Sequence, residues 1–221
     1  MAGGVVEIGV GEGRSFFLLA SSVQEGERAF AVDIFVDEPR SNGESRKLQL
    51  FRETAKKVGI SLPSECVYVG RSESVSPDLL NAVGEARFFS IDGGHSAIEV
   101  ATDARLADSI LADHGVVAFD DFGNPEWPEV AVAAIDFLRQ NQNRYSAFAI
   151  TRGKLYVCRN EFHARYREAL TSARMLRRFP KREVDFLGSR AIWVHQSVTS
   201  RILSQAFLRI GMGRIVSPQG F

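Results

Sequence analysis

Short apolar runs alternate with helical patterns along most of the chain, and this alternation constrains the fold more than any other feature. The run GVVEIGV at residues 4–10 precedes helical spacing at 14–24, and AFAVDIF at 29–35 precedes an amphipathic stripe at 45–59. Repeated strand-then-helix units are typical of a parallel sheet covered by helices on both faces. The same patterns predict further strands at 66–70, 86–92 and 116–121, and further helices at 76–84, 96–115 and 128–141.

Two strand patterns near residue 150 break the alternation. YSAFAIT at 145–151 and KLYVCR at 154–159 are separated by one arginine and one glycine, which is typical of an antiparallel hairpin. We therefore predict an α/β fold, a Rossmann-like doubly wound sheet of about seven mostly parallel strands that ends in this hairpin. We expect the domain to span residues 1–159. A C-terminal helical appendage at 160–221 should pack on the domain or on a second subunit.

The charges of the chain balance, with 27 lysines and arginines against 27 aspartates and glutamates. A neutral chain gives no electrostatic reason to expect nucleic acid or an anionic membrane as a partner. The segment from Arg159 to Arg182 is locally basic. A solvated helix face is the simpler interpretation of this segment, and a nucleic-acid role is the alternative.

The cysteines and the hydropathy indicate a cytoplasmic protein. Cys66 and Cys158 lie inside apolar runs without the spacing of metal ligands, as core thiols do. No apolar run is long enough to span a membrane, and the N-terminus lacks the regions of a signal peptide.

Three glycines close the first predicted strand in VEIGVGEGRS, at Gly9, Gly11 and Gly13. Glycines let a backbone turn tightly into a helix and approach a ligand closely, although a plain turn would use them too. The dinucleotide fingerprint needs glycine where Arg14 stands, and no Walker lysine follows.

VVEIGVGEGRS resembles the first motif of class I S-adenosylmethionine-dependent methyltransferases, which reads E/D-x-G-x-G-x-G. The resemblance implies a cofactor site formed by Glu7, Gly9, Gly11, Gly13 and Ser15.

Two later segments extend this resemblance. Asp33, 20 residues after Gly13, resembles the acidic residue that binds the ribose hydroxyls, and a carboxylate can accept both of their protons. Asp37 and Glu38 are alternative acids nearby. The loop GRSES, which contains Ser72, resembles the adenine-contacting loop, with an ordinary turn as the alternative.

Three carboxylates stand where neighbouring strands should end, Asp92 after the fourth strand and Asp120 and Asp121 after the fifth. Adjacent strands lie about 5 Å apart, so these acids could converge. Successive strand residues point to opposite faces, so the fifth strand must end between Asp120 and Asp121 if both are to take part. Converging carboxylates need a cation, and oxygen ligands suit Mg²⁺, Mn²⁺ or Ca²⁺. Helix capping is the alternative.

FFSIDGGHS together with VVAFDDFGNPEWPEV resembles small metal-dependent O-methyltransferases, including sugar methyltransferases of macrolide biosynthesis. The resemblance implies that Asp92, Asp120 and Asp121 bind a divalent metal and that Asp92 also lies at the cofactor and takes part in catalysis. His95 would be the general base, a role that suits histidine because its pKa lies near neutral pH. A turn or cap histidine is the alternative.

The sequence thus predicts an S-adenosylmethionine-dependent, Mg²⁺-dependent O-methyltransferase that acts on a hydroxyl of a sugar or another small metabolite. We expect a homo-oligomer without nucleic-acid or membrane partners. The resemblance implies helices before the first strand, and this sequence begins close to that strand. The tail or a second subunit could cover the site instead, and a missing cover is the third alternative. The alternatives are a metal-independent methyltransferase and a nucleoside-binding module without catalysis.

Overall fold

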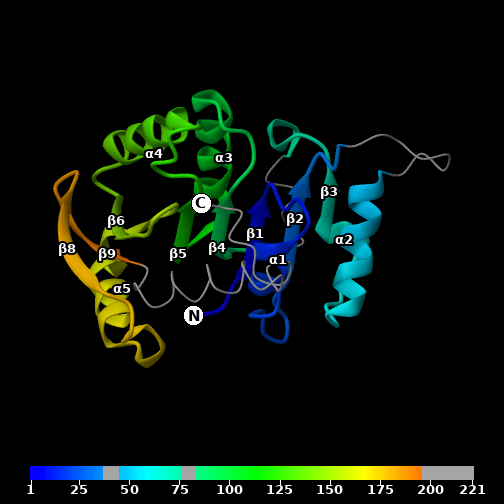
Figure 1. Cartoon of the computed structure of the whole chain (residues 1–221), viewed down its shortest axis with the longest axis horizontal. Coiled ribbons are helices and arrows are strands. Elements are labelled where there is room, and N and C mark those ends of the chain that lie inside the picture. The colour runs from blue at the N-terminus through cyan, green and yellow to red at the C-terminus, as the bar shows by residue number, and fades with distance from the viewer. Residues whose placement is uncertain (37–44, 76–82, 196–221) are drawn as a thin grey trace, which may run out of the picture. The chain divides into compact units, whose positions relative to one another are not determined.

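The computed structural model describes residues 1–36, 45–75 and 83–195 (Figure 1). The chain divides into two compact units, Met1–Ala118 and Phe119–Phe221, here called the N-terminal and the C-terminal unit. The alternative acids Asp37 and Glu38 lie outside the described residues. Most of the predicted helix at 76–84 lies outside them too.

The N-terminal unit is built on parallel strands. β1 (Gly4–Ile8) lies between β2 (Ala29–Asp33) and β4 (Ala86–Ile91), and β3 (Val67–Val69) pairs with β2. Every residue of β1 is buried, as expected for a central strand of a sheet covered on both faces. β5 (Leu111–Phe119) follows β4 in the strand order.

Serine side chains begin two of the helices of this unit. The Ser45 hydroxyl accepts the Leu48 N–H, and the Ser96 hydroxyl accepts the Glu99 N–H. Each such cap satisfies a backbone donor that has no partner within the helix, which stabilises the helix by about 1 kcal/mol. The α-helices are α1 (Arg14–Ala20), α2 (Arg46–Lys57) and α3 (Ala97–Ile110), and the 3₁₀ helices are η1 (Ser64–Cys66) and η2 (Ser72–Ser74).

A cluster of phenylalanines forms part of the core of the N-terminal unit. Phe51 of α2 is fully buried, and its ring centroid lies 5.0 Å from Phe17, 5.3 Å from Phe35 and 5.4 Å from Phe16. These contacts join α2 to α1 and to the loop that follows β2. They therefore fix the segment that carries Asp33.

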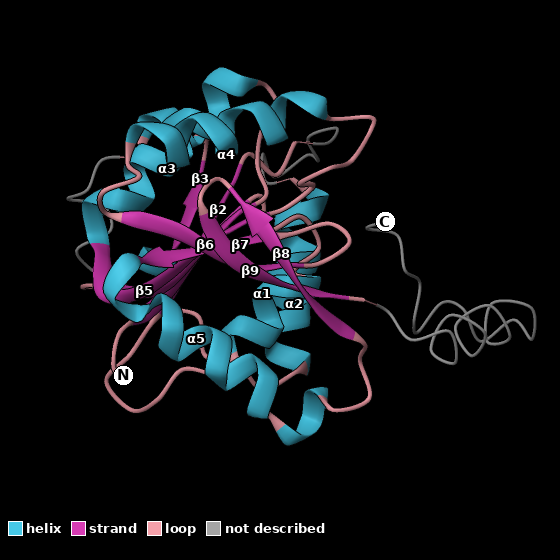
Figure 2. Cartoon of the chain, turned by 90° about the vertical axis from the view of Figure 1, so that its left-hand side faces the viewer, coloured by secondary structure: helices cyan, strands magenta, loops and turns pink. Residues whose placement is uncertain are grey.

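The C-terminal unit contains two antiparallel pairs. β6 (Tyr145–Ile150) pairs with β7 (Leu155–Arg159), which confirms the predicted hairpin, and β8 (Lys181–Phe186) pairs with β9 (Ser189–Val194). β9 in turn lies parallel to β6, and α5 packs on both of these strands (Figure 2). The helices are α4 (Pro128–Gln140), α5 (Asn160–Ser172) and the 3₁₀ helix η4 (Arg174–Leu176).

The strands run in the order β3-β2-β1-β4-β5-β7-β6-β9-β8. The predicted fold class, a mostly parallel α/β sheet with an antiparallel terminal part, is confirmed. The sheet has nine strands in the described part of the chain, rather than about seven. The domain boundary after residue 159 stays a prediction.

The hairpin β8–β9 adds two strands to the appendage that was predicted as helical. α5 is helical as expected, but residues 181–194 form the hairpin β8–β9. Its two-residue turn has positive φ at both Leu187 (47°) and Gly188 (80°). Turns of this type usually contain Asn-Gly, and leucine rarely adopts a positive φ. The Leu-Gly pair therefore gave no signal for this hairpin.

The end of α3 is a second correction. The helix was predicted to continue to a terminal Gly115, but it ends at Ile110, and Gly115 lies inside β5. A Cβ on Gly115 would lie 2.6 Å from Leu111 Cγ and 2.8 Å from the Ala86 carbonyl oxygen. This glycine therefore permits close packing and does not end the helix.

Both cysteines are buried free thiols, as predicted. Burial raises the pKa of Cys66, and it raises the pKa of Cys158 to about 12. Across the three described ranges, no helix combines the length and the apolar character needed to cross a bilayer.

Candidate active site

A cavity of about 410 Å³ opens at the carboxyl ends of β1, β2 and β4, entirely within the N-terminal unit. This edge of a parallel sheet is where α/β folds bind ligands. Among the predicted cofactor residues, those that line the cavity are Gly9, Gly11, Asp33, Ser72 and Asp92.

The other three predicted cofactor residues do not line the cavity. The Glu7 side chain is fully buried within β1. Gly13 precedes α1 in the left-handed conformation, and a Cβ there would lie 2.2 Å from the Phe17 ring. Ser15 belongs to the first turn of α1. Their cofactor roles stay predictions.

Asp33 organises the loops on either side of it. Its carboxylate accepts the Gly11 N–H at 2.8 Å and the Phe35 N–H at 2.6 Å. A carboxylate has about four acceptor positions, so two backbone donors leave capacity for a ribose diol. The structure therefore holds this carboxylate in a fixed orientation at the cavity wall.

Gly9, directly after β1, packs against the backbone that follows β4. The Asp92 N–H donates to the Ile8 carbonyl oxygen at 2.9 Å, and the Gly9 N–H donates to the Val32 carbonyl oxygen at 2.8 Å. A Cβ on Gly9 would lie 1.7 Å from the Asp92 carbonyl oxygen. Only glycine can occupy this position without moving Asp92.

The lining of the cavity also carries an ion-pair network that the sequence analysis missed. Arg71 lies 3.7 Å from both Glu73 and Glu99. Glu99 also completes a capping box with Ser96. The hydrogen bonds from Ser96, together with the charge of Arg71, lower the pKa of Glu99. The spacing S-x-x-E at residues 96–99 was the available signal.

Asp103 on α3 is a second residue that the sequence analysis missed. Its side chain is fully buried, and neither carboxylate oxygen makes a hydrogen bond of ordinary geometry with a described residue. Its Oδ2 lies 3.3 Å from where a Cβ on Gly93 would stand. Burial raises the pKa of Asp103 to about 6, although the Ser72 hydroxyl opposes the rise. The available signal was an acid on the apolar stripe formed with Val100 and Ala107.

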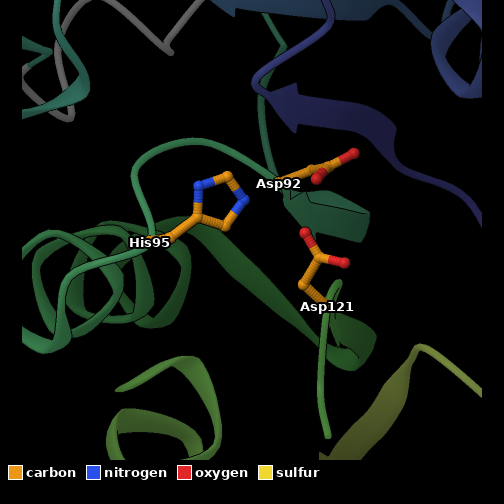
Figure 3. Close-up of side chains that lie close together, drawn as sticks. All are labelled: Asp92, His95 and Asp121. Atoms are coloured by element: carbon orange, nitrogen blue, oxygen red, sulfur yellow. The ribbon is translucent and has the colours of Figure 1, made fainter. Parts of the chain in front are cut away.

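Asp92, His95 and Asp121 lie close together in Figure 3. One potential ligand atom from each lies within 4.8 Å of the others, and all three residues are half-buried. Asp92 and His95 belong to the loop after β4, and Asp121 follows the end of β5 with a φ of 53°. The set offers two carboxylates and one imidazole to a cation.

Asp120 does not belong to this group of three side chains. Its carboxylate forms an ion pair with Lys154 and accepts the Asp121 N–H at 3.0 Å. β5 ends at Phe119, before both aspartates, so their side chains need not alternate as in a strand. The structure thus groups Asp121 with Asp92, and the metal role of Asp120 stays a prediction.

Comparison with known proteins agrees with the fold. Residues 6–122, more than half of the chain, match a family described as a methyltransferase domain. The chain therefore belongs to this family, and it is a class I S-adenosylmethionine-dependent methyltransferase. No match was found among curated protein sequences.

Solved structures share the fold at low sequence identity. The O-methyltransferase NovP is 16% identical with a TM-score of 0.55, over 71% of this chain and 72% of that chain. CalS11, a TDP-rhamnose 3'-O-methyltransferase of calicheamicin biosynthesis, is 17% identical with a TM-score of 0.52, over 72% of this chain and 73% of that chain.

Replacing Gly9 by alanine should abolish binding of S-adenosylhomocysteine, because the new Cβ would collide with the Asp92 backbone. Gly26→Ala is a matched control, since Gly26 has a φ of 85° against 84° for Gly9 but nothing within 4 Å of its Cβ position. The control should lose only about 1–2 kcal/mol of stability and keep its affinity. Calorimetric titration measures both affinities, and equal losses in the two variants would contradict the steric argument.

Asp103→Asn should stabilise the protein at alkaline pH. The folded-state pKa of about 6 exceeds the ordinary value of 3.8, so the wild type loses stability as pH rises from about 4 to about 6 and stays less stable above that range. Asparagine removes this penalty, giving a gain of up to about 3 kcal/mol at pH 8 that vanishes near pH 4. Urea unfolding followed by circular dichroism measures the gain. The exposed control Glu53→Gln should show no such trend, and a pH-independent difference for Asp103→Asn would refute the assignment.

Proposed function

We propose that this enzyme transfers the methyl group of S-adenosylmethionine to a hydroxyl of a sugar or another small metabolite, with the help of a divalent cation. The observation that carries the proposal is the group formed by Asp92, His95 and Asp121 beside the cofactor cavity. It is the one group of three or more potential metal-binding side chains among the described residues. The fold likeness to NovP and CalS11 supports an oxygen acceptor.

Methyl transfer requires alignment more than activation of the donor. The sulfonium sulfur is already a good leaving group, so the enzyme has to hold the methyl carbon in line with the attacking oxygen. The backbone-anchored carboxylate of Asp33 and the glycine loop suit the task of holding the nucleoside end. Asp92 lines the same cavity and would meet the methionine end.

The residues present fit a divalent cation. The carboxylates of Asp92 and Asp121 repel one another at this separation unless positive charge compensates them. Two carboxylates suit Mg²⁺ or Mn²⁺, with Ca²⁺ as a further candidate, and they leave the imidazole free to act as a base. When bound, such a cation polarises the acceptor hydroxyl and makes its proton easier to remove.

We assign that proton to His95. As the acceptor oxygen forms its bond to the methyl carbon, the carbon–sulfur bond breaks and the hydroxyl proton passes to the imidazole. The products are a methyl ether, S-adenosylhomocysteine and a protonated His95. The position of His95 beside both carboxylates supports this role, because the carboxylates stabilise the imidazolium that forms.

The remaining expectations belong to this proposal. We propose a cytoplasmic homo-oligomer with no nucleic-acid or membrane partner. A metal-independent methyltransferase, in which the carboxylates only shape the cavity, is the competing function.

Asp121→Asn should weaken Mn²⁺ binding at least tenfold, which corresponds to about 1.4 kcal/mol. Asp120→Asn is the matched control, because it removes a neighbouring carboxylate that is paired with Lys154 and should change Mn²⁺ affinity by less than about threefold. Electron paramagnetic resonance of free Mn²⁺, with saturating S-adenosylhomocysteine, gives both affinities. No Mn²⁺ binding by the wild type would favour the metal-independent reaction, and a larger effect of Asp120→Asn would make Asp120 the ligand.

His95→Gln should lower turnover by about 10²–10⁴ through loss of the base. Its affinities for S-adenosylhomocysteine and for Mn²⁺ should stay within about threefold of the wild type. Turnover is followed by release of S-adenosylhomocysteine over a panel of nucleotide sugars and other small hydroxyl compounds. A loss of Mn²⁺ affinity parallel to the loss of turnover would show that His95 is a metal ligand and not the base.

A further inference from the structure

A second cavity, of about 680 Å³, lies entirely within the C-terminal unit. It is bounded by the end of α4, the start of β6, one face of α5 and the turn between β8 and β9. Figure 2 shows α5 and the strands of this unit. Cavities of this size hold small-molecule ligands.

The lining of this cavity is cationic. It includes Arg139, Arg167 and Arg190 together with His163, and no carboxylate of a described residue takes part. His163 and Arg167 are four residues apart on α5 and so share one helix face. The cavity therefore gathers positive charge from three separate elements of a chain whose net charge is zero.

The charges nearby compensate these arginines only in part. Glu183 pairs with Arg167 and lies 3.5 Å from Arg190, which is also 3.9 Å from the exposed Asp185. The side chains of Glu183 and Asp185 are exposed, and pairs with exposed partners contribute little. Arg139 forms no ion pair with any described residue.

The side chain of Arg167 includes a buried donor that a ligand could satisfy. The Nε of Arg167 is buried and has no hydrogen-bond partner among the described residues. A buried N–H without a partner is costly, so such groups usually mark a place for a ligand or an ordered water. Asn160 also lines the cavity, at the start of α5.

The cavity lies away from the Asp120–Lys154 ion pair of the same unit. Tyr145, which lines it, begins β6, whereas Lys154 binds Asp120 next to the turn that follows β6. A six-residue strand spans roughly 17 Å, so the two features lie at opposite ends of β6.

We propose that this cavity binds a small ligand that carries a phosphate or diphosphate group. Guanidinium groups bind phosphate oxygens in a bidentate manner, and several of them around one cavity suit a dianion better than a single carboxylate. A cavity lined by four separate segments suits a compact ligand better than a nucleic-acid strand. The shared chemistry covers free phosphate, a sugar phosphate and a nucleoside diphosphate.

The test is calorimetric titration of the full chain with pyrophosphate, at low salt, without divalent metal and with saturating S-adenosylhomocysteine. Arg139→Ala should weaken binding about tenfold or more, because it removes a charge-assisted contact. The control is Arg165→Ala, which deletes an exposed arginine of α5 that does not line the cavity and should change the affinity less than about twofold. Arg167→Lys keeps the charge but removes Nε, and it should weaken binding as well.

Titrations with inorganic phosphate, glucose 1-phosphate and a nucleoside diphosphate then distinguish the sources of the phosphate group. No binding of any of these up to about 10 mM would overturn the proposal. Equal losses for Arg139→Ala and Arg165→Ala would also overturn it, since binding would then follow diffuse charge. An oligonucleotide that binds in an Arg139-dependent way while pyrophosphate does not would replace it with a nucleic-acid surface. None of these outcomes depends on methyl transfer.

Discussion

The close approach of β1 and β4 at Gly9 is the constraint on which the cofactor site depends. The backbone of Asp92 occupies the space that any side chain at Gly9 would need. This contact, with the hydrogen bonds from Asp92 to Ile8 and from Gly9 to Val32, joins the ends of three strands. The loops that line the cavity start from these ends, so their separation is set by the sheet. Asp33 then ties the glycine loop to the loop after β2 through two backbone donors.

Charge compensation differs among the acids around the site, and this separates their chemistry. Backbone N–H groups hold Asp33, Arg71 and Ser96 hold Glu99, and Lys154 holds Asp120. Asp103 is compensated by a proton at low pH, because burial disfavours its charge. The acids that lie beside His95 are the ones that a dissociable cation could bridge. Neighbouring carboxylates around this site therefore have different partners, although they share one functional group.

The sequence allows prediction of features that rest on local patterns. The strand and helix periodicity gives the fold class, the Arg-Gly spacing gives the hairpin β6–β7, and the glycine motif with Asp33 and Ser72 gives much of the cavity wall. Features that rest on distant partners escape such prediction. Lys154 meets Asp120 from 34 residues away, and the burial of Asp103 depends on how α3 packs. The turn at Leu187 could not be predicted for another reason, because leucine rarely adopts the positive φ that this residue has.

The two cysteines have a practical consequence for studying the enzyme's flexibility. Each unit holds one, Cys66 in the N-terminal unit and Cys158 in the C-terminal unit, and the chain has no others. Both are buried with raised pKa values, so very little of either thiol is present as the reactive thiolate while the native packing persists. Alkylation rates of the two thiols therefore report the opening of each unit separately. The unmodified chain thus contains a natural pair of probes for local unfolding.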